Sequence, residues 1–342
     1  MENFLRPWII ALLFASLGAS IAWIRGAITS IPILRGFKPF ERSETQIALE
    51  KRAELATRFI SLGALSSIVA LFILVIGADQ AAADIEGAMC AYGVIHSTEY
   101  GPLALSAAAA VAFLGIVFWE LHRLDLRAAV PVLVRPQFIA FLFVAPIAVY
   151  SSHLTLRFVE SLDFSIVATC CSSGMTSNLS RGQSLPSTTP MAPFLLSVAA
   201  LAGVIALALR LSLRETRQRL NGFALSGTAL IAIVSSATAL GSSVAPHLYE
   251  TPAHRCAFCL LSFPELAFGI PYLIAFFIVL IGFIRATLGS ALLNHREIGD
   301  AAQESLKNSA WLLIVGASAL MLISAFPVLR YLVLSGETLF GW

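Results

Sequence analysis

The sequence predicts an all-α fold, a polytopic integral membrane helical bundle of about eight transmembrane helices. Of its 342 residues, 58% are hydrophobic and only 12% are charged, whereas soluble domains carry about 25% charged residues. The mean hydropathy is +0.85. Long apolar runs recur along the chain, and a helix that crosses the hydrocarbon needs about 20 mainly apolar residues. A chain of this composition cannot cover a water-facing surface, so a membrane-embedded bundle is expected.

Eight apolar segments account for these helices, and we interpret residues 1–342 as a single transmembrane domain. The first segment is interpreted as a retained helix and not as a signal peptide, because only Arg6 precedes it while a run of positive charges follows it. Several segments are shorter than the bilayer requires, so their ends are expected to extend into flanking residues. The predicted helices lie near 8–24, 60–77, 103–119, 137–150, 191–209, 223–240, 270–284 and 311–334.

The distribution of Lys and Arg predicts the orientation of the chain in a cell's inner (cytoplasmic) membrane. Segments 25–59, 120–136, 210–222 and 285–310 contain 17 of the 22 basic residues, and the segments on the other side of the predicted helices contain 4. Cytoplasmic loops carry the excess of positive charge. Both termini are therefore predicted to be extracytoplasmic, together with the outer loops 78–102, 151–190 and 241–269.

One long helix is predicted over residues 41–77, with its first half beyond the membrane on the cytoplasmic side. Residues 41–59 contain good helix formers and neither Gly nor Pro. Glu54 and Arg58 form an i,i+4 pair in the favourable order. We interpret the segment as a solvated extension of a transmembrane helix, and its part 41–58 is the expected surface for other protein subunits.

Several classes of function find no support in the sequence. There is no Walker A motif, no dinucleotide-binding glycine pattern and no His-Glu-x-x-His. The cytoplasmic segments are too short to hold a nucleotide-binding domain. The basic residues lie where the topology requires them, so no nucleic acid is expected as a partner. The lipid bilayer and further protein subunits are the partners that the sequence favours.

Soft metal ligands gather on one side of the predicted topology. All five cysteines and four of the six histidines lie in or beside the outer loops, and the cytoplasmic side has no cysteine. Cysteines used as small apolar fillers would more often lie within the helices. The cysteine loops follow the second, fourth and sixth predicted helices. We interpret them as similar turns and predict that they converge.

The segment "PAHRCAFCLL" at residues 252–261 holds the most complete of these loops, with a Cys-x-x-Cys and a nearby histidine. Two cysteines at this spacing can direct two sulfurs at one ion, and thiolates with imidazole select copper(I) or zinc. We therefore expect an extracytoplasmic site for a thiophilic metal, as the membrane component of a transport or metal-delivery system. The predicted ligands are Cys256, Cys259, His254, Cys170, Cys171 and Cys90.

Two other interpretations of the cysteines stay open at this point. Cys256 and Cys259 can form a reversible two-electron couple, which would make the protein a membrane thiol–disulfide relay. Alternatively, the cysteines only staple loops of a structural subunit in an oxidising compartment. Whether the protein is an enzyme depends on this choice. Haem is not expected, because Leu260 stands where the covalent Cys-x-x-Cys-His signature needs histidine.

Overall fold

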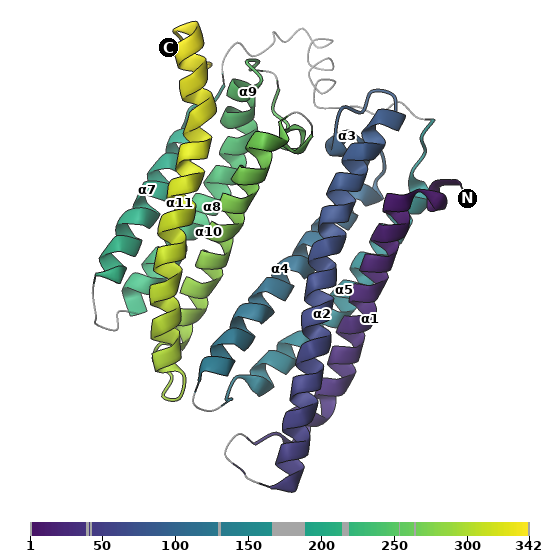
Figure 1. The fold of residues 1–342 in the computed structure, drawn as a ribbon, viewed down its shortest axis with the longest axis vertical. Coiled ribbons are helices and arrows are strands. Elements are labelled where there is room, and N and C mark those ends of the chain that lie inside the picture. Colours follow the sequence, from purple (N-terminus) through teal and green to yellow (C-terminus); the bar gives the residue numbers. More distant parts are fainter. Residues whose placement is uncertain are drawn as a thin grey trace. The chain divides into compact units, whose positions relative to one another are not determined.

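The structure, a computed structural model, describes residues 2–38, 41, 43–128, 131–165, 189–213, 219–252, 254–262 and 265–340. In these ranges the chain is helical and contains no strand (Figure 1). Eight of the described helices are long and apolar enough to cross a membrane. The predicted fold class, an all-α polytopic bundle, is confirmed.

The chain divides into two compact units, Met1–Ala168 and Thr169–Trp342, where the sequence had been interpreted as a single domain. In unit 1 the four long helices pack in a closed ring, in which each contacts the next and α1 contacts α5. They are α1 (Pro7–Gly36), α2 (Glu44–Ala81), α4 (Tyr100–Arg127) and α5 (Val134–Ser161). A short helix, α3 (Ala91–Ile95), lies between α2 and α4.

Unit 2 repeats this order of helices and contacts, with α7 packed on α8 and α11, and α10 on α8 and α11. The four are α7 (Ala192–Ser212), α8 (Arg219–Ala239), α10 (Leu266–Leu292) and α11 (Gly299–Ser335). A π turn, Leu240–Val244, leads from α8 into α9 (Ala245–Leu248). In each unit a cysteine-bearing connection joins the second long helix to the third. The two connections thus occupy corresponding places in a four-helix repeat.

Small residues set the distance between neighbouring helices. A Cβ atom added to Gly115 on α4 would lie 2.8 Å from the Cβ of Ala64 on α2. In unit 2, a Cβ atom at Gly282 on α10 would lie 2.7 Å from the Cγ of Leu313 on α11. Helices in lipid gain their packing energy from such close approach, because the hydrophobic effect does not drive them together there. Glycine is therefore needed at both contacts.

Buried hydroxyl groups also join the helices. The Ser20 and Ser152 hydroxyls, on α1 and α5, lie 2.7 Å apart. In unit 2 the hydroxyls of Ser197 and Ser236, on α7 and α8, lie 2.8 Å apart. An unpaired hydroxyl is costly in an apolar interior, so these pairs favour one arrangement of the helices over others.

The helices are longer than the apolar segments that predicted them. The helix expected over 41–77 is confirmed as α2, whose first turn is capped by the Ser43 side chain accepting from the Gln46 N–H. The predicted Glu54–Arg58 ion pair is present on its surface. α5 runs on to Ser161, into the segment predicted as an outer loop from 151. Charged and polar helix formers continue a helix after hydropathy stops marking it.

Candidate metal centre

The segment between α9 and α10 folds back on itself and carries Cys256 and Cys259. Glu250 has a φ of 56°, in the left-handed region, and turns the chain as it leaves α9. The Thr251 N–H donates to the Pro246 carbonyl at 3.0 Å, and the His254 N–H donates to the Thr251 carbonyl at 3.1 Å. These bonds make a compact turn that leads directly into the Cys-x-x-Cys.

The two cysteine sulfurs of this segment lie close together and are withdrawn from solvent. The Sγ atoms of Cys256 and Cys259 are within 4.8 Å of each other. A short 3-10 helix, Phe258–Leu261, contains the second cysteine. The two residues are 3% and 5% exposed. Two sulfurs bound about 2.3 Å from the same ion can lie up to about 4.6 Å apart. The separation of the pair, at most 4.8 Å, is therefore close to the spacing that a shared metal ion requires.

His254 is the third predicted ligand in this segment, and one of its ring nitrogens has no hydrogen bond. Its Nε2 atom is buried and has no partner among the described residues. Burial lowers the pKa of His254 below its ordinary value, and the negative charges of Cys256 and Glu265 oppose that shift. The imidazole is thus neutral at pH 7 and keeps a lone pair for a metal.

Tyr249 connects the histidine to the cysteine turn. Its ring lies against the His254 ring, with centroids 3.9 Å apart. Its hydroxyl donates to the Cys259 carbonyl at 2.9 Å. The same carbonyl accepts from the Ser262 hydroxyl at 2.7 Å. The side chain of Tyr249 therefore fixes the imidazole on one side and the backbone of the second cysteine on the other.

α10, the third long helix of unit 2, packs closely against the Cys-x-x-Cys turn. A Cβ atom added to Gly269, near the start of α10, would lie 1.9 Å from the Leu260 carbonyl oxygen. Only glycine lets the helix approach the Cys-x-x-Cys segment so closely. Gly101 makes the corresponding approach in unit 1, where an added Cβ atom would lie 1.9 Å from the Ile95 carbonyl oxygen.

The remaining predicted ligands lie elsewhere in the chain. Cys90 belongs to unit 1, where it is buried and immediately precedes α3. The Ala91 N–H next to it donates to the Asp79 carboxylate at 3.2 Å. Cys170 and Cys171 lie outside the described residues. The structure thus brings together the sulfurs of Cys256 and Cys259. His254 lies in the same turn, but neither of its ring nitrogens is within 4.8 Å of both sulfurs, so a shared ion needs its side chain to turn toward them. The assignment of Cys90, Cys170 and Cys171 stays a prediction.

Another histidine of the predicted outer side has a structural role. His247 is buried, and its Nδ1 donates to the Ser243 carbonyl at 2.7 Å. Its Nε2 accepts from the Leu339 N–H at 3.2 Å. Both ring nitrogens are therefore hydrogen-bonded, and the bond to Nε2 holds the C-terminal segment of unit 2.

Sequence reasoning did not identify Tyr249 and Glu265 as neighbours of the site. Glu265 directly precedes α10, and its charge acts on His254. The signal that could have indicated Tyr249 is an aromatic residue five positions before a histidine, across a Pro-containing turn.

Comparison of the chain with protein-family models, with curated proteins and with solved structures gave no significant match. The chemistry of the site therefore carries the functional argument.

Proposed function

We propose that the protein binds a thiophilic metal ion through Cys256, Cys259 and His254, as the membrane component of a transport or metal-delivery system. The observation that carries the proposal is the pair of buried sulfurs within 4.8 Å in the same turn as an imidazole nitrogen without a hydrogen bond. Soft thiolate ligands with imidazole select copper(I) or zinc.

The balance of charge supports a cation at this place. Two buried thiolates would be costly in an apolar environment unless a positive charge accompanies them. His254 cannot supply that charge at pH 7, because burial lowers its pKa. A bound metal offsets the thiolate charges and satisfies the histidine Nε2 at once. Metal binding also releases the thiol protons, so affinity rises with pH in the range where the thiols titrate.

The number of ligands bears on which metal is bound. Zinc takes four ligands in a tetrahedron, and two sulfurs with one nitrogen leave a fourth position. The sequence offers Cys90, Cys170 and Cys171 as proposed further ligands, since their loops follow even numbers of predicted spans, as the Cys256 loop does. A copper(I) ion would be satisfied by the soft ligands alone. The metal and the fourth ligand are settled by measurement on the purified protein.

The location of the site is part of the proposal. The multi-pass character follows from eight membrane-length helices. The excess of Lys and Arg in the alternate connections supports an inner-membrane protein with both termini and all cysteines extracytoplasmic. The cytoplasmic extension 41–58, in the first half of α2, is the proposed contact for other subunits of the system.

A thiol–disulfide relay through Cys256 and Cys259 is the alternative function. The Cys-x-x-Cys spacing suits it, but a redox-active cysteine must be reached by its partner, and such cysteines are typically partly exposed. The exposures of 3% and 5% favour the metal. A structural subunit with loop-stapling disulfides is the third possibility.

Metal analysis of the purified full-length protein tests the proposal. Protein loaded separately with zinc or copper(I), then freed of excess metal, is expected to retain about one ion per chain. The Cys256→Ser/Cys259→Ser variant should lose the bound ion. His295→Ala, a control at an exposed histidine that contacts Glu297, should retain it. Metal-free wild type whose two cysteines cycle with a dithiol partner would establish the relay instead. Permanent disulfides without metal would leave only the structural role.

A further inference from the structure

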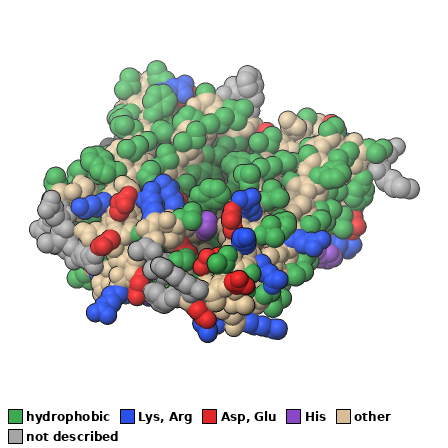
Figure 2. All heavy atoms as spheres, turned by 60° about the horizontal axis from the view of Figure 1, so that its bottom comes forward, with side chains coloured by type: hydrophobic (Ala, Val, Ile, Leu, Met, Phe, Trp, Pro, Cys, Tyr) green, Lys and Arg blue, Asp and Glu red, His purple; other side chains and the backbone are tan. Residues whose placement is uncertain are grey.

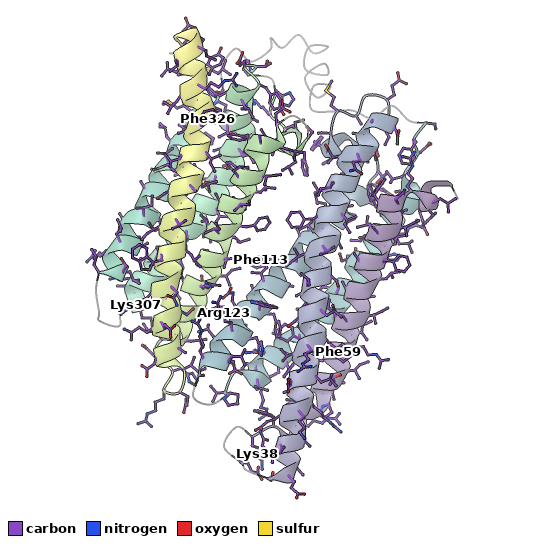
Figure 3. The ribbon with its side chains drawn as sticks, in the orientation of Figure 1. Lys38, Phe59, Phe113, Arg123, Lys307 and Phe326 are labelled. Atoms are coloured by element: carbon purple, nitrogen blue, oxygen red, sulfur yellow. The ribbon has the colours of Figure 1, made fainter. Side chains whose placement is uncertain are left out.

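Unit 1 contains a large cavity at the end of α2, α4 and α5 where the α1–α2 and α4–α5 connections lie. Its volume is about 1030 Å³, at the upper end of the range of ligand pockets. The lining comes from these three helices and their connections, and includes Glu50, Arg58, Trp119, Arg123, Asp125 and Phe138. Figure 3 labels Arg123 on the lower part of α4.

The walls of this cavity are mainly apolar. Phe138 is 1% exposed and forms part of the buried core beneath it, whereas Trp119 is 54% exposed. Figure 2 turns this end of the molecule forward and shows charged side chains gathered there, with hydrophobic side chains behind them. Tryptophan with nearby charges is typical of the membrane–water interface. The cavity thus joins an apolar surface to a charged rim.

Most charges at the rim have partners of their own. Arg58 is paired with Glu54 one turn before it on α2. The Asp125 carboxylate accepts from the Leu133 N–H at 2.9 Å. Within the described ranges, Arg123 makes no ion pair or hydrogen bond. A guanidinium that lines a cavity without a partner indicates an anionic ligand.

A negative charge is available on the opposite helix. Glu50 lines the cavity from α2, and among the described residues its carboxylate accepts only from the neutral Gln46 amide, at 3.1 Å. The cavity therefore presents one available cation, Arg123 on α4, and two carboxylates that accept only from neutral groups among the described residues, Glu50 on α2 and Asp125 on α4, between apolar walls. A ligand that complements it carries a negative and a positive group on one apolar body.

We propose that this cavity binds a phospholipid whose headgroup carries a primary ammonium, such as phosphatidylethanolamine. The phosphate is bound by Arg123, the ammonium donates hydrogen bonds to Glu50, and the acyl chains lie along Trp119 and the apolar wall. Basic pockets between transmembrane helices bind lipid headgroups in other membrane proteins. A free phosphate would use Arg123 alone and leave the apolar wall bare.

Native mass spectrometry of the delipidated full-length protein tests the proposal, with titration by phosphatidylethanolamine, phosphatidylcholine and phosphatidylglycerol. Phosphatidylethanolamine is expected to bind best, because the choline headgroup lacks N–H donors and the glycerol headgroup lacks the positive charge. Arg123→Ala should weaken binding about tenfold, as expected for one lost charge-assisted contact. Glu50→Gln should reduce the preference for phosphatidylethanolamine over phosphatidylcholine.

Arg52→Ala is the matched control, because Arg52 is an exposed arginine of α2 that does not line the cavity. It should bind the lipids as the wild type does. Equal losses in Arg52→Ala and Arg123→Ala would overturn the proposal, as would equal affinity for the three lipids or stronger binding of phosphatidylcholine. Inorganic phosphate that competes with the lipid at millimolar concentration would show an anion site without lipid selectivity, which also contradicts it.

Discussion

The rings of Tyr249 and His254 pack against each other at an interplanar angle of 33°, with their centroids 3.9 Å apart, while the Tyr249 hydroxyl donates to the Cys259 carbonyl. One side chain thus holds both the proposed nitrogen ligand and the backbone of a proposed sulfur ligand. Groups that orient metal ligands in this way typically change metal affinity by about 10- to 100-fold when they are removed.

Substitution of Tyr249 separates these two contacts. Tyr249→Phe keeps the ring and loses a hydrogen bond worth about 1 kcal/mol, so metal affinity should fall several-fold at most. Tyr249→Ala loses the ring as well and should weaken binding by at least about tenfold. Competition with a chelator of known affinity measures both. Equal affinities in all three proteins would show that Tyr249 does not position the ligands.

The stability of the metal-free protein should depend on pH through His254. The folded-state pKa of His254 is lowered by burial, so the unfolded chain binds the proton more tightly than the folded chain does. The folded state therefore loses stability as pH falls below the unfolded pKa of about 6.5. This loss should be smaller in His254→Gln. Melting temperatures in detergent with chelator, at pH 7.5 and pH 5.5, measure the difference, and identical pH dependence of both proteins would contradict it.

Gly269 should not tolerate a side chain. An added Cβ atom would lie 1.9 Å from the Leu260 carbonyl oxygen, so Gly269→Ala must displace the Cys-x-x-Cys segment or α10. We expect a lower melting temperature and weaker metal binding. Gly227→Ala is the control, since no atom lies within 4 Å of the added Cβ there and alanine favours a helix by about 1 kcal/mol. A Gly269→Ala protein as stable as Gly227→Ala would refute the close approach.

The proposed orientation predicts which residues a membrane-impermeant thiol reagent reaches. In a cysteine-free background, Glu337→Cys near the C-terminus should be labelled in intact cells. Arg52→Cys on α2 should react only after the membrane is permeabilised. Both positions are exposed in the structure, so burial does not account for a difference. The reverse pattern would place the cysteine loops in the cytoplasm.

The fold could be predicted from the sequence because lipid demands apolar helices of a minimum length. The ends of the helices were less predictable. α5 continues through Arg157 and Glu160, whose side chains form a 2.8 Å ion pair that hydropathy cannot indicate. The division into two units was not foreseen, since helices that are apolar all round show no face that identifies their neighbours.

The candidate site was predictable where its residues are local. His254, Cys256 and Cys259 lie within six positions, so they share a single turn, in which the two sulfurs come within 4.8 Å of each other. Tyr249 was missed because its stacking on His254 depends on the left-handed turn at Glu250, with a φ of 56°. In the described residues a repeat of four helices relates the Cys90 and Cys256 connections. The third cysteine loop, with Cys170 and Cys171, lies outside them, so the similarity of all three loops stays a prediction.

X-ray absorption spectroscopy of the metal-loaded full-length protein tests the central claim most directly, because it counts the atoms bound to the metal. The account predicts at least two sulfur ligands at about 2.3 Å and one nitrogen at about 2.0 Å for zinc. The sulfur signal should disappear in Cys256→Ser/Cys259→Ser, and the nitrogen signal in His254→Ala. A metal surrounded only by oxygen and nitrogen, or a spectrum that these substitutions leave unchanged, would contradict the account.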